Sequence, residues 1–530
     1  MQKSEQKLSK GTIREISYLD LSYFASFFFP ELCYYPFNQF HEDYFNFKLS
    51  YVNDDIKNRQ GDKAVFCAPR DSAKSTIISN IDVIHDIVFG LEKYIAIFSA
   101  TESQVVKRIT DIKHQLIHNS ILKRYFKLKG NPRFWTGHKL IVNDICIEGF
   151  SAGSEVLGIN FESYRPTKII LDDSEDFKKV DVPEQREKKE NWFKEVIEEL
   201  GASYTNIIAI GTNLHQEGLI ARLLKRPDFK HFFYQSVLSW NKNQELWDEW
   251  KRIYINLDNA NRVEDARAYF DNHKTEMLKD TSVFWEESED YYTLQVKLIT
   301  QGRKAFFKNK QNDPRHTEKN IFVLDELEYF TLKDNAIHRD DGKIIPLKDL
   351  FIYGFYDPSM GDTNKGKDPD YPAIATIGKD GHSNLYLLDC WFELCSPTKQ
   401  LEMIFNLNDI YHFNLFGIET NNFQKILLEP FKMIQQKRMN EGKSYQIAIS
   451  EINHSSNKIA RIEAIEPLTS NRWLKFNRNI KQEFYNLMEQ FPTARYDDPL
   501  DAVEGAVQLA RTNIVTMSET EEQENFLGVR

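Results

Sequence analysis

The sequence predicts two α/β domains, the first built on a mainly parallel sheet and the second on a mixed sheet. In the first half, apolar runs over residues 65–68 and 94–98 flank a helical pattern over residues 77–87. This order of strand, helix and strand is typical of parallel sheets. In the second half, three apolar runs over residues 351–392 include a closely spaced pair, which favours hairpin pairing and antiparallel neighbours. At 530 residues, the chain is also too long for one hydrophobic core.

Composition and charge narrow the class of protein. The chain has no run of about 18 apolar residues, and its first residues lack the apolar segment of a secretion signal. We therefore expect no membrane segment and a cytoplasmic location. Five scattered cysteines, without zinc-ligand spacing, fit a reducing compartment. The net charge of −11 argues against nucleic-acid binding unless the basic residues are gathered on one surface. Local clusters of basic residues are therefore more informative than the net charge.

A loop of small residues follows the first apolar run and ends in Lys74-Ser75-Thr76. Such a loop turns backbone N–H groups and a helix start toward one point, where a Lys and a hydroxyl hold phosphate and Mg²⁺. We therefore expect a site for ATP and Mg²⁺. The consensus has Gly where Ala68 and Ala73 stand, and an ordinary helix start is the alternative. The residues expected to line the nucleotide are Arg70, Asp71, Ser72, Ala73, Lys74, Ser75 and Thr76.

An aromatic-rich segment over residues 18–48 precedes this loop and carries Gln39 and His41. ATPases often place a polar side chain upstream of the loop to contact the edge of the base. Gln39 or His41 is therefore a candidate for binding the adenine. Packing of the aromatic segment is the alternative interpretation.

Acidic residues follow a continuous apolar run over residues 169–171. Such a run predicts a strand buried on both faces, and ligands bind at the carboxyl ends of strands in parallel sheets. Asp172 would hold the Mg²⁺ shared with Ser75, and Asp173 or Glu175 would polarise the attacking water. A solvated acidic turn is the alternative.

A third apolar run over residues 206–210 ends in Gly211-Thr212-Asn213-Leu214-His215. Together with Arg70 inside the loop and Arg165-Pro166 before the paired Asp residues, this ending resembles the large terminase subunit of tailed bacteriophages. The resemblance implies that Gly211-Thr212-Asn213 matches the coupling motif, which senses the γ-phosphate and links hydrolysis to movement. It therefore places Thr212 at the nucleotide.

In the second half, acids stand at the ends of separate elements. Asp357 and Glu419 each end an apolar run, and residues 497–501 open a helical pattern. Clustered carboxylates of this kind hold two Mg²⁺ or Mn²⁺ ions for phosphodiester hydrolysis. In the last group, Asp498 before Pro499 is also a good helix cap, and Asp501 favours the helix dipole, so a purely structural role is the alternative.

The order of these acids resembles the ribonuclease H-like fold, and Asp-Asp-x-x-Asp-Ala resembles the closing motif of the terminase nuclease. Asp370-Tyr371 matches an acid–aromatic pair of the same family. The resemblance favours Asp498 as the third metal ligand, with Asp501 and Asp497 as alternatives. The candidate ligands are Asp357, Asp370, Glu419, Asp497, Asp498 and Asp501, and the candidate catalytic residues among them are Asp357, Glu419, Asp498 and Asp501.

Basic and aromatic residues alternate between the second and third acids. Lys458, Arg461 and the segment over residues 472–481 carry this pattern. One interpretation is a groove that follows the DNA backbone through phosphate contacts. A solvated surface is the other.

The whole sequence is therefore interpreted as an ATPase domain over residues 1–235, a connecting region with a helical insertion over 236–344, a nuclease domain over 345–512 and a flexible acidic tail over 513–530. The resemblance implies a viral motor subunit that packages double-stranded DNA into a procapsid and cleaves concatemeric DNA. It also implies a homo-oligomeric ring on the portal protein, a small terminase subunit as partner and a location in the host cell cytoplasm. A cellular helicase-nuclease of DNA repair and a non-hydrolysing scaffold are the alternatives.

Overall fold

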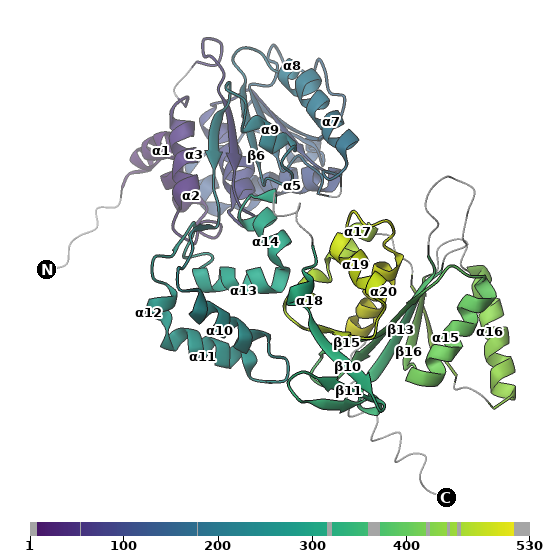
Figure 1. Ribbon diagram of the computed structural model, residues 1–530. Coiled ribbons are helices and arrows are strands. Elements are labelled where there is room, and N and C mark those ends of the chain that lie inside the picture. Colours follow the sequence, from purple (N-terminus) through teal and green to yellow (C-terminus); the bar gives the residue numbers. More distant parts are fainter. Residues whose placement is uncertain are drawn as a thin grey trace, which may run out of the picture. The chain divides into compact units, whose positions relative to one another are not determined.

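The computed structural model describes residues 8–52, 55–177, 179–314, 321–358, 371–419, 425–442, 446–452 and 457–512. The chain divides into two compact units (Figure 1). The first comprises Met1–Lys242, Leu278–Leu298 and Arg303–His316, and the second comprises Asn243–Met277, Ile299–Gly302 and Thr317–Arg530.

Within its described residues, the first unit contains a seven-stranded sheet in the order β3-β4-β2-β5-β6-β1-β7. All neighbouring strands are parallel except β3 and β4. In sheet order, the strands are β3 (Lys139–Val142), β4 (Ile145–Ser151), β2 (Tyr94–Ser99), β5 (Lys168–Asp172), β6 (Asn206–Gly211), β1 (Lys63–Cys67) and β7 (Lys230–Phe233).

Helices cover both faces of this sheet. Alternate residues of each central strand enter one of two apolar cores, because side chains of a strand point to opposite faces in turn. In β5, for example, Ile170 packs on the face covered by the helices from α1 to α6, whereas Ile169 and Leu171 pack against α7, η3 and α9. The helical elements are α1 (Lys10–Leu19), α2 (Leu21–Phe28), α3 (Gln39–Leu49), the π-helix η1 (Thr76–Ile81), α4 (Asp82–Phe89), α5 (Glu102–His118), α6 (Ser120–Tyr125), η2 (Pro132–Phe134), α7 (Pro183–Trp192), η3 (Phe193–Ile197), α8 (Glu198–Leu200), α9 (Leu219–Leu223) and α14 (Arg303–Lys310), with α13 (Tyr291–Gln301) spanning the division between the units.

A buried ion network ties the strands together at the ends opposite the predicted ligand site. Lys168 begins β5 and contacts both Asp82 and Asp86 of α4, and Lys48 of α3 contacts the same two carboxylates. Although burial acts to raise it, Lys168 and Lys48 hold the pKa of Asp82 below its ordinary value. Three possible metal ligands meet here, Asp82, His85 and Asp86, but the two lysines already supply the positive charge.

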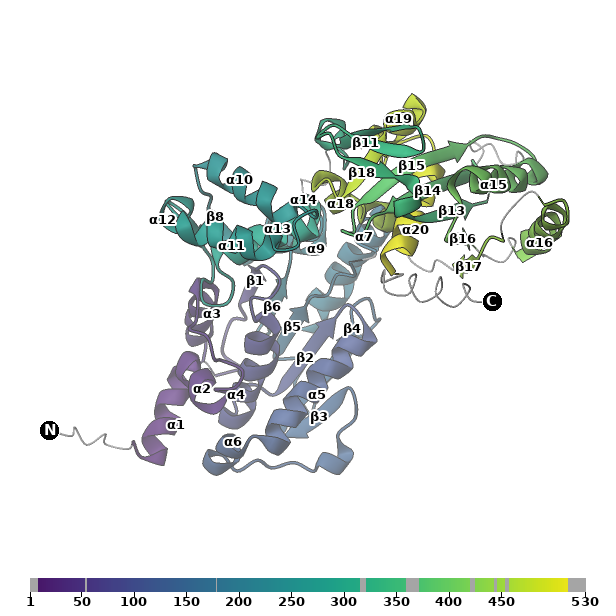
Figure 2. The ribbon, with the colours of Figure 1, turned by 90° about the horizontal axis from the view of Figure 1, so that it is seen from below.

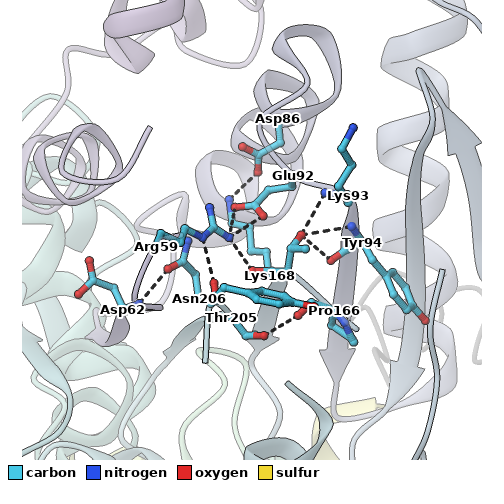
Figure 3. A network of polar contacts seen from close by, with 12 residues as sticks. Arg59, Asp62, Asp86, Glu92, Lys93, Tyr94, Pro166, Lys168, Thr205 and Asn206 are labelled. Atoms are coloured by element: carbon cyan, nitrogen blue, oxygen red, sulfur yellow. Dashed lines mark hydrogen bonds and ion pairs between the residues drawn. The ribbon is translucent and has the colours of Figure 1, made fainter. Parts of the chain in front are cut away.

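Arg59 extends this network across neighbouring strands (Figure 3). Its guanidinium pairs with buried Glu92 at 2.8 Å and donates to the carbonyl oxygens of Thr167 and Tyr204 at 2.8 and 2.9 Å. Thr167 directly precedes β5 and Tyr204 lies two residues before β6, so these contacts hold the starts of the two strands at the same end of the sheet.

The second unit contains a nine-stranded sheet within its described residues, in the order β12-β11-β10-β18-β15-β14-β13-β16-β17. Antiparallel pairs join β12 to β11, β11 to β10, β15 to β14 and β14 to β13, and the remaining neighbours are parallel. The strands are β12 (Ile344–Pro346), β11 (Ala336–Arg339), β10 (Glu328–Lys333), β18 (Leu474–Asn477), β15 (Leu385–Phe392), β14 (Ala373–Lys379), β13 (Phe351–Asp357), β16 (Leu415–Glu419) and β17 (Ile449–Ile452).

This sheet is also covered on both faces. Tyr353 and Phe355 of β13 pack with α19 and α20 on one face, and Ile352 and Tyr356 pack with α15 on the other. The helical elements of the unit are α10 (Gln244–Ile255), α11 (Arg262–Asn272), α12 (Lys274–Met277), η5 (Leu324–Glu326), η6 (Leu347–Asp349), α15 (Pro397–Tyr411), α16 (Lys425–Asn440), α17 (Lys458–Glu463), α18 (Glu466–Ser470), α19 (Gln482–Gln490) and α20 (Asp498–Thr512). A small separate sheet, which belongs to the first unit, pairs β8 (Val237–Ser239) with β9 (Ser282–Val283).

The predicted fold class, α/β with one mainly parallel and one mixed sheet, is confirmed. The helical pattern after the loop forms as predicted, although its first part is wound as the π-helix η1. The second sheet starts earlier than the expected boundary at 345, because β10, β11 and β12 belong to it. The acidic tail over 513–530 lies outside the described residues. Among the described helices, none is both long and apolar enough to span a membrane.

Candidate active sites

The predicted phosphate-binding loop connects β1 to η1, in the middle of the first sheet. Ala68, the first loop residue, donates its N–H to the carbonyl of Gly211 at the end of β6 at 3.1 Å. Inside the loop, Ser72 Oγ donates to the carbonyl of Pro69 at 2.8 Å. The ends of β1, β5 and β6 therefore meet at one edge, where parallel strands place ligand sites.

Two loop residues have left-handed backbones, Asp71 with φ 69° and Ala73 with φ 57°. Glycine reaches this region without a Cβ penalty, whereas an L-residue there pays about 1–2 kcal/mol. Ala73 thus adopts the conformation for which the consensus loop has Gly. Asp71 is held by Lys310 of α14, whose Nζ lies 2.8 Å from the carboxylate and 3.0 Å from the carbonyl of Arg70.

Lys74 points back along the loop. Its Nζ donates to the carbonyl of Pro69 at 3.0 Å and to Thr212 Oγ1 at 3.4 Å, and the residue is only 6% exposed. Thr212, expected at the nucleotide from the resemblance, is therefore in contact with the loop lysine. The buried ammonium group of Lys74 therefore lies among the carboxyl ends of the central strands.

Ser75 and Asp172 lie together, as the expectation of a shared Mg²⁺ requires. Ser75 Oγ donates to Asp172 Oδ1 at 2.7 Å, and Asp172 is 1% exposed. Burial raises the pKa of Asp172, and the charge of Arg108 opposes this rise. A hydroxyl and a carboxylate are hard oxygen donors, so these two side chains fit a magnesium ion.

The two candidates for polarising water differ in their surroundings. Asp173 follows β5 with a left-handed backbone, φ 45°. Glu175 accepts the N–H groups of Leu219 at 2.7 Å and Ile220 at 3.2 Å, so its carboxylate caps the start of α9. A Cβ on Gly218 would lie 2.7 Å from the same carboxylate, which explains a glycine at that position.

A cavity of about 560 Å³ lies over the loop. Its lining includes residues 70–76, Thr212 and both water-polarising candidates. Gln39 is not in this lining; it is exposed and donates to Asp43 at 2.8 Å. His41 is 1% exposed and packs its ring against Trp285 at 5.0 Å between centroids, as the packing interpretation expects.

The acids of the second unit converge because of strand alternation. Asp357 follows Tyr353 and Phe355 at every second position of β13 and therefore points to the face that α20 covers. In β16, Phe416 and Ile418 enter the opposite core, so Glu419 points to the α20 face as well. The two strands are parallel neighbours with Tyr356 opposite Ile418, so both acids reach the same edge.

Asp501 of α20 completes this cluster. One carboxylate oxygen from each of Asp357, Glu419 and Asp501 lies within 4.8 Å of the other two. Burial raises the pKa of Asp357 well above its ordinary value; Lys458 acts against this rise, and the neighbouring carboxylates add to it. Three buried carboxylates that disfavour one another's charge fit a divalent-cation site, because a bound cation would relieve that repulsion.

The other carboxylates of the closing motif have different contacts. Asp498 accepts the N–H of Tyr371 at 2.9 Å and lies 2.7 Å from Lys458 Nζ. Asp497 lies 2.8 Å from the same ammonium, and its carbonyl accepts the N–H of Asp501 at 3.0 Å. Helix α20 begins at Asp498 itself, one residue earlier than a capping role for Asp498 would place it. Asp370 lies outside the described residues.

Most of the alternating basic residues make intramolecular contacts. Lys458 and Arg461 of α17 face the acids of α20, where Arg461 contacts both Asp501 and Glu504. Lys475 is 2% exposed and donates to Asn384 at 2.8 Å, so it does not face a DNA groove. The ring of Trp473 is likewise engaged, through a 2.9 Å hydrogen bond to the carbonyl of Ile255.

Sequence patterns did not single out three further charged residues of these sites. Arg108 contacts Ser75 and Asp172, Lys310 holds the loop through Asp71, and Glu504 follows Asp501 by one helical turn. Burial raises the pKa of Glu504 to about 7. In the sequence, Arg108 and Glu504 each stand beside an apolar stripe of a helix. This pattern predicts that they are half-buried, but it does not identify the residues they contact. Arg165, which stands before the paired Asp residues, donates to the carbonyl oxygens of Glu199 and Gly201.

No protein-family model matches this chain. No curated protein matches it either. Among solved structures, the chain is similar to the large terminase from a thermophilic bacteriophage in complex with ADP, with 9% identity, coverage of 89% of this chain and 99% of that chain, and a TM-score of 0.43. It is also similar to the HK97 bacteriophage large terminase, with 11% identity, coverage of 89% and 95%, and a TM-score of 0.29.

A human cytomegalovirus terminase nuclease domain, soaked with Mn and bound to an inhibitor, is similar over 35% of this chain and 90% of its own, with 16% identity and a TM-score of 0.27. These similar structures are large terminases of bacteriophages and a terminase nuclease domain.

Proposed function

We propose that this chain is an ATP-driven DNA-packaging motor subunit that also cleaves DNA by two-metal hydrolysis. The observation that carries the proposal is the presence of two differently built sites in one chain. The first combines a buried loop Lys with a Ser–Asp pair at the edge of a parallel sheet. The second brings three buried carboxylates together at the edge of a mixed sheet.

In the first unit, Lys74 would donate to the phosphate oxygens, in place of the carbonyl that it contacts here. Ser75 and Asp172 would hold Mg²⁺, which neutralises the charge that develops on the phosphates. Asp173 or Glu175 would orient the attacking water. Since Glu175 also caps α9, movement of its carboxylate would be transmitted to the helix that follows β6.

In the second unit, Asp357, Glu419 and Asp501 would hold the metal ions. Bound metal supplies an activated water and stabilises the leaving oxygen. Lys458 and Arg461, which both contact Asp501, are placed to attract a phosphate of the DNA backbone toward this cluster.

The first unit would therefore be the motor domain and the second the nuclease domain. The finer parts of the proposal follow the resemblance of the motifs to large terminases. They are double-stranded DNA as substrate, a homo-oligomeric ring on a portal protein, a small terminase subunit as partner, and the host cell cytoplasm as location.

Paired assays on one preparation test the proposal, with ATP hydrolysis measured with and without double-stranded DNA and plasmid nicking measured in Mn²⁺. Lys74→Ala should abolish hydrolysis and leave nicking within a few-fold of wild type, whereas Asp357→Ala should do the reverse. In each variant, the activity that is retained shows that the chain is still folded. Wild-type ATP turnover in Lys74→Ala contradicts the motor site, and strand separation of a labelled duplex favours the helicase-nuclease alternative.

A further inference from the structure

The side chain of Arg108 connects the two groups that the proposed function assigns to magnesium. Its Nε donates to Asp172 Oδ2 at 2.6 Å, and its Nη2 donates to Ser75 Oγ at 2.7 Å. Ser75 Oγ in turn donates to Asp172 Oδ1 at 2.7 Å. The three side chains therefore form a closed ring of hydrogen bonds, each of which involves a charged donor or a charged acceptor.

Helix α5 delivers Arg108 from a fixed backbone. Val105, Ile109 and Ile112 are buried against the sheet at helical spacing, and Figure 2 shows α5 lying along β2 and β4. Arg108 stands beside this stripe, and its side chain is 22% exposed and lines the cavity over the loop. Its long stem can move without any shift of the helix.

Arg108 and a metal ion compete for the same two side chains. A divalent cation bound by Ser75 and Asp172 draws on oxygen lone pairs of the two groups to which the guanidinium donates. It also repels a second positive charge at the same place. Binding of Mg²⁺ at this pair therefore favours the release of Arg108.

We propose that Arg108 is a mobile cation of the nucleotide site, which yields Ser75 and Asp172 to Mg²⁺ and then binds phosphate oxygens of the triphosphate. This inference rests on the proposed ATP site. Phosphate oxygens that share a metal ion with Ser75 must lie next to Ser75 Oγ, and Arg108 already contacts that atom. The planar guanidinium matches two phosphate oxygens at once, which an ammonium does not.

The alternative is a static ion pair that only stabilises the fold. The static ion pair and the mobile cation predict different effects of Arg108 on the magnesium requirement of nucleotide binding. A static pair leaves the magnesium requirement of nucleotide binding unchanged when Arg108 is replaced, whereas a displaced cation competes with the metal. Transfer of the released guanidinium to the terminal phosphate would mean, in addition, that the arginine contributes to binding of a triphosphate but not of a diphosphate.

The test measures binding of a fluorescent, non-hydrolysable ATP analogue and of the matching ADP analogue over a series of Mg²⁺ concentrations. The variants are Arg108→Gln and Arg108→Lys. Lys107→Gln on the same helix removes an exposed positive charge and is the matched control. Melting curves without metal establish that each variant is folded.

In Arg108→Gln, the Mg²⁺ concentration at half-saturation should fall about threefold to tenfold, the range expected when one charge-assisted contact no longer competes. The preference for the triphosphate over the diphosphate should fall by a similar factor. Arg108→Lys should restore the magnesium requirement but not the full triphosphate preference, and Lys107→Gln should match wild type.

An unchanged magnesium requirement in Arg108→Gln, with normal melting, overturns the displacement. An unchanged triphosphate preference overturns the transfer to phosphate. Failure of the proposed function gives a different result: neither analogue then binds the wild-type protein in a manner that Lys74→Ala abolishes.

Discussion

Among single residues, the acids of the second unit differ in whether they lie close to the other acids, although Asp501 also contacts Arg461. Asp501 shares the 4.8 Å cluster with Asp357 and Glu419. Both oxygens of Asp498 have partners elsewhere, one in the N–H of Tyr371 and one in Lys458. The motif resemblance favours Asp498 as the third ligand, whereas the geometry favours Asp501.

We predict that Asp501→Asn weakens Mn²⁺ binding by more than about 100-fold, because it removes a ligand, whereas Asp498→Asn weakens it by only about tenfold, because it alters a neighbour of the ligands. Calorimetric titration of Mn²⁺ into the two variants and wild type is the measurement. Equal losses in both would return Asp498 to the ligand set. Normal binding in Asp501→Asn would show that the residue serves the helix alone.

His41, which is buried in the first turn of α3, leads to a second prediction. Burial lowers the pKa of His41 to about 4, while its Nδ1 accepts the N–H of Asn38 in a capping box. A depressed histidine pKa contributes stability that is present above its unfolded value near 6.5 and is lost as the pH falls through about 4. Acidification should therefore weaken the first unit.

His41→Gln keeps an acceptor at the capping-box position and removes the titration. Between pH 7 and pH 4.5, we expect the variant to lose about 2 kcal/mol less free energy of unfolding than wild type. Urea denaturation of the first unit at a series of pH values measures this difference. Parallel pH profiles for the two proteins would mean that the buried imidazole does not set acid sensitivity.

At the scale of elements, the packing of α20 on β13 decides whether the acids meet. A Cβ on Gly505 would lie 2.5 Å from the ring of Phe355, so only glycine permits this approach without a shift. Gly505 is one turn beyond Asp501, and Phe355 is two residues before Asp357. The close approach of the helix therefore positions one metal-ligand candidate relative to another.

We predict that Gly505→Ala destabilises the second unit by about 1–3 kcal/mol through overpacking and lowers plasmid nicking, while ATP hydrolysis remains at the wild-type level. Gln508→Ala, at an exposed position of the same helix, is the control. Thermal melting and the paired activity assays are compared across the three proteins. Wild-type melting and nicking in Gly505→Ala would show that α20 can retreat without disturbing the acids.

At the scale of the whole molecule, the second sheet extends beyond the domain boundary expected at 345. Strand β10 pairs in parallel with β18, with Glu328 opposite Lys475, and β11 and β12 continue the sheet from β10. Removing these strands would expose the edge of β18, which lies next to β15.

We therefore predict that a fragment of residues 321–512 folds cooperatively and nicks DNA in Mn²⁺ without nucleotide, whereas a fragment of residues 347–512 aggregates or melts at a lower temperature. The second fragment retains every candidate metal ligand, so the pair isolates the effect of the additional strands. Circular dichroism melting, light scattering and plasmid nicking are the measurements. Identical behaviour of the two fragments would place the folding boundary at 345 after all.

The sequence alone determined the two sheets, the loop after β1 and the acids at the ends of β5, β13 and β16. These features depend on short-range patterns, because apolar periodicity, small-residue turns and charged strand ends are all encoded within a few neighbouring residues. Strand alternation then places Asp357 and Glu419 on one face.

The partners of those groups are set by the packing of elements that lie far apart in the sequence. Arg108 reaches Asp172 across 64 residues of sequence, and Arg461 reaches Asp501 across 40. The burial of Lys475 and the capping of α9 by Glu175 are of the same kind. Such partners depend on how the helices pack against a sheet. A charged residue beside an apolar stripe has the same local sequence pattern whether it faces solvent, DNA or a carboxylate, so the pattern does not identify its partner.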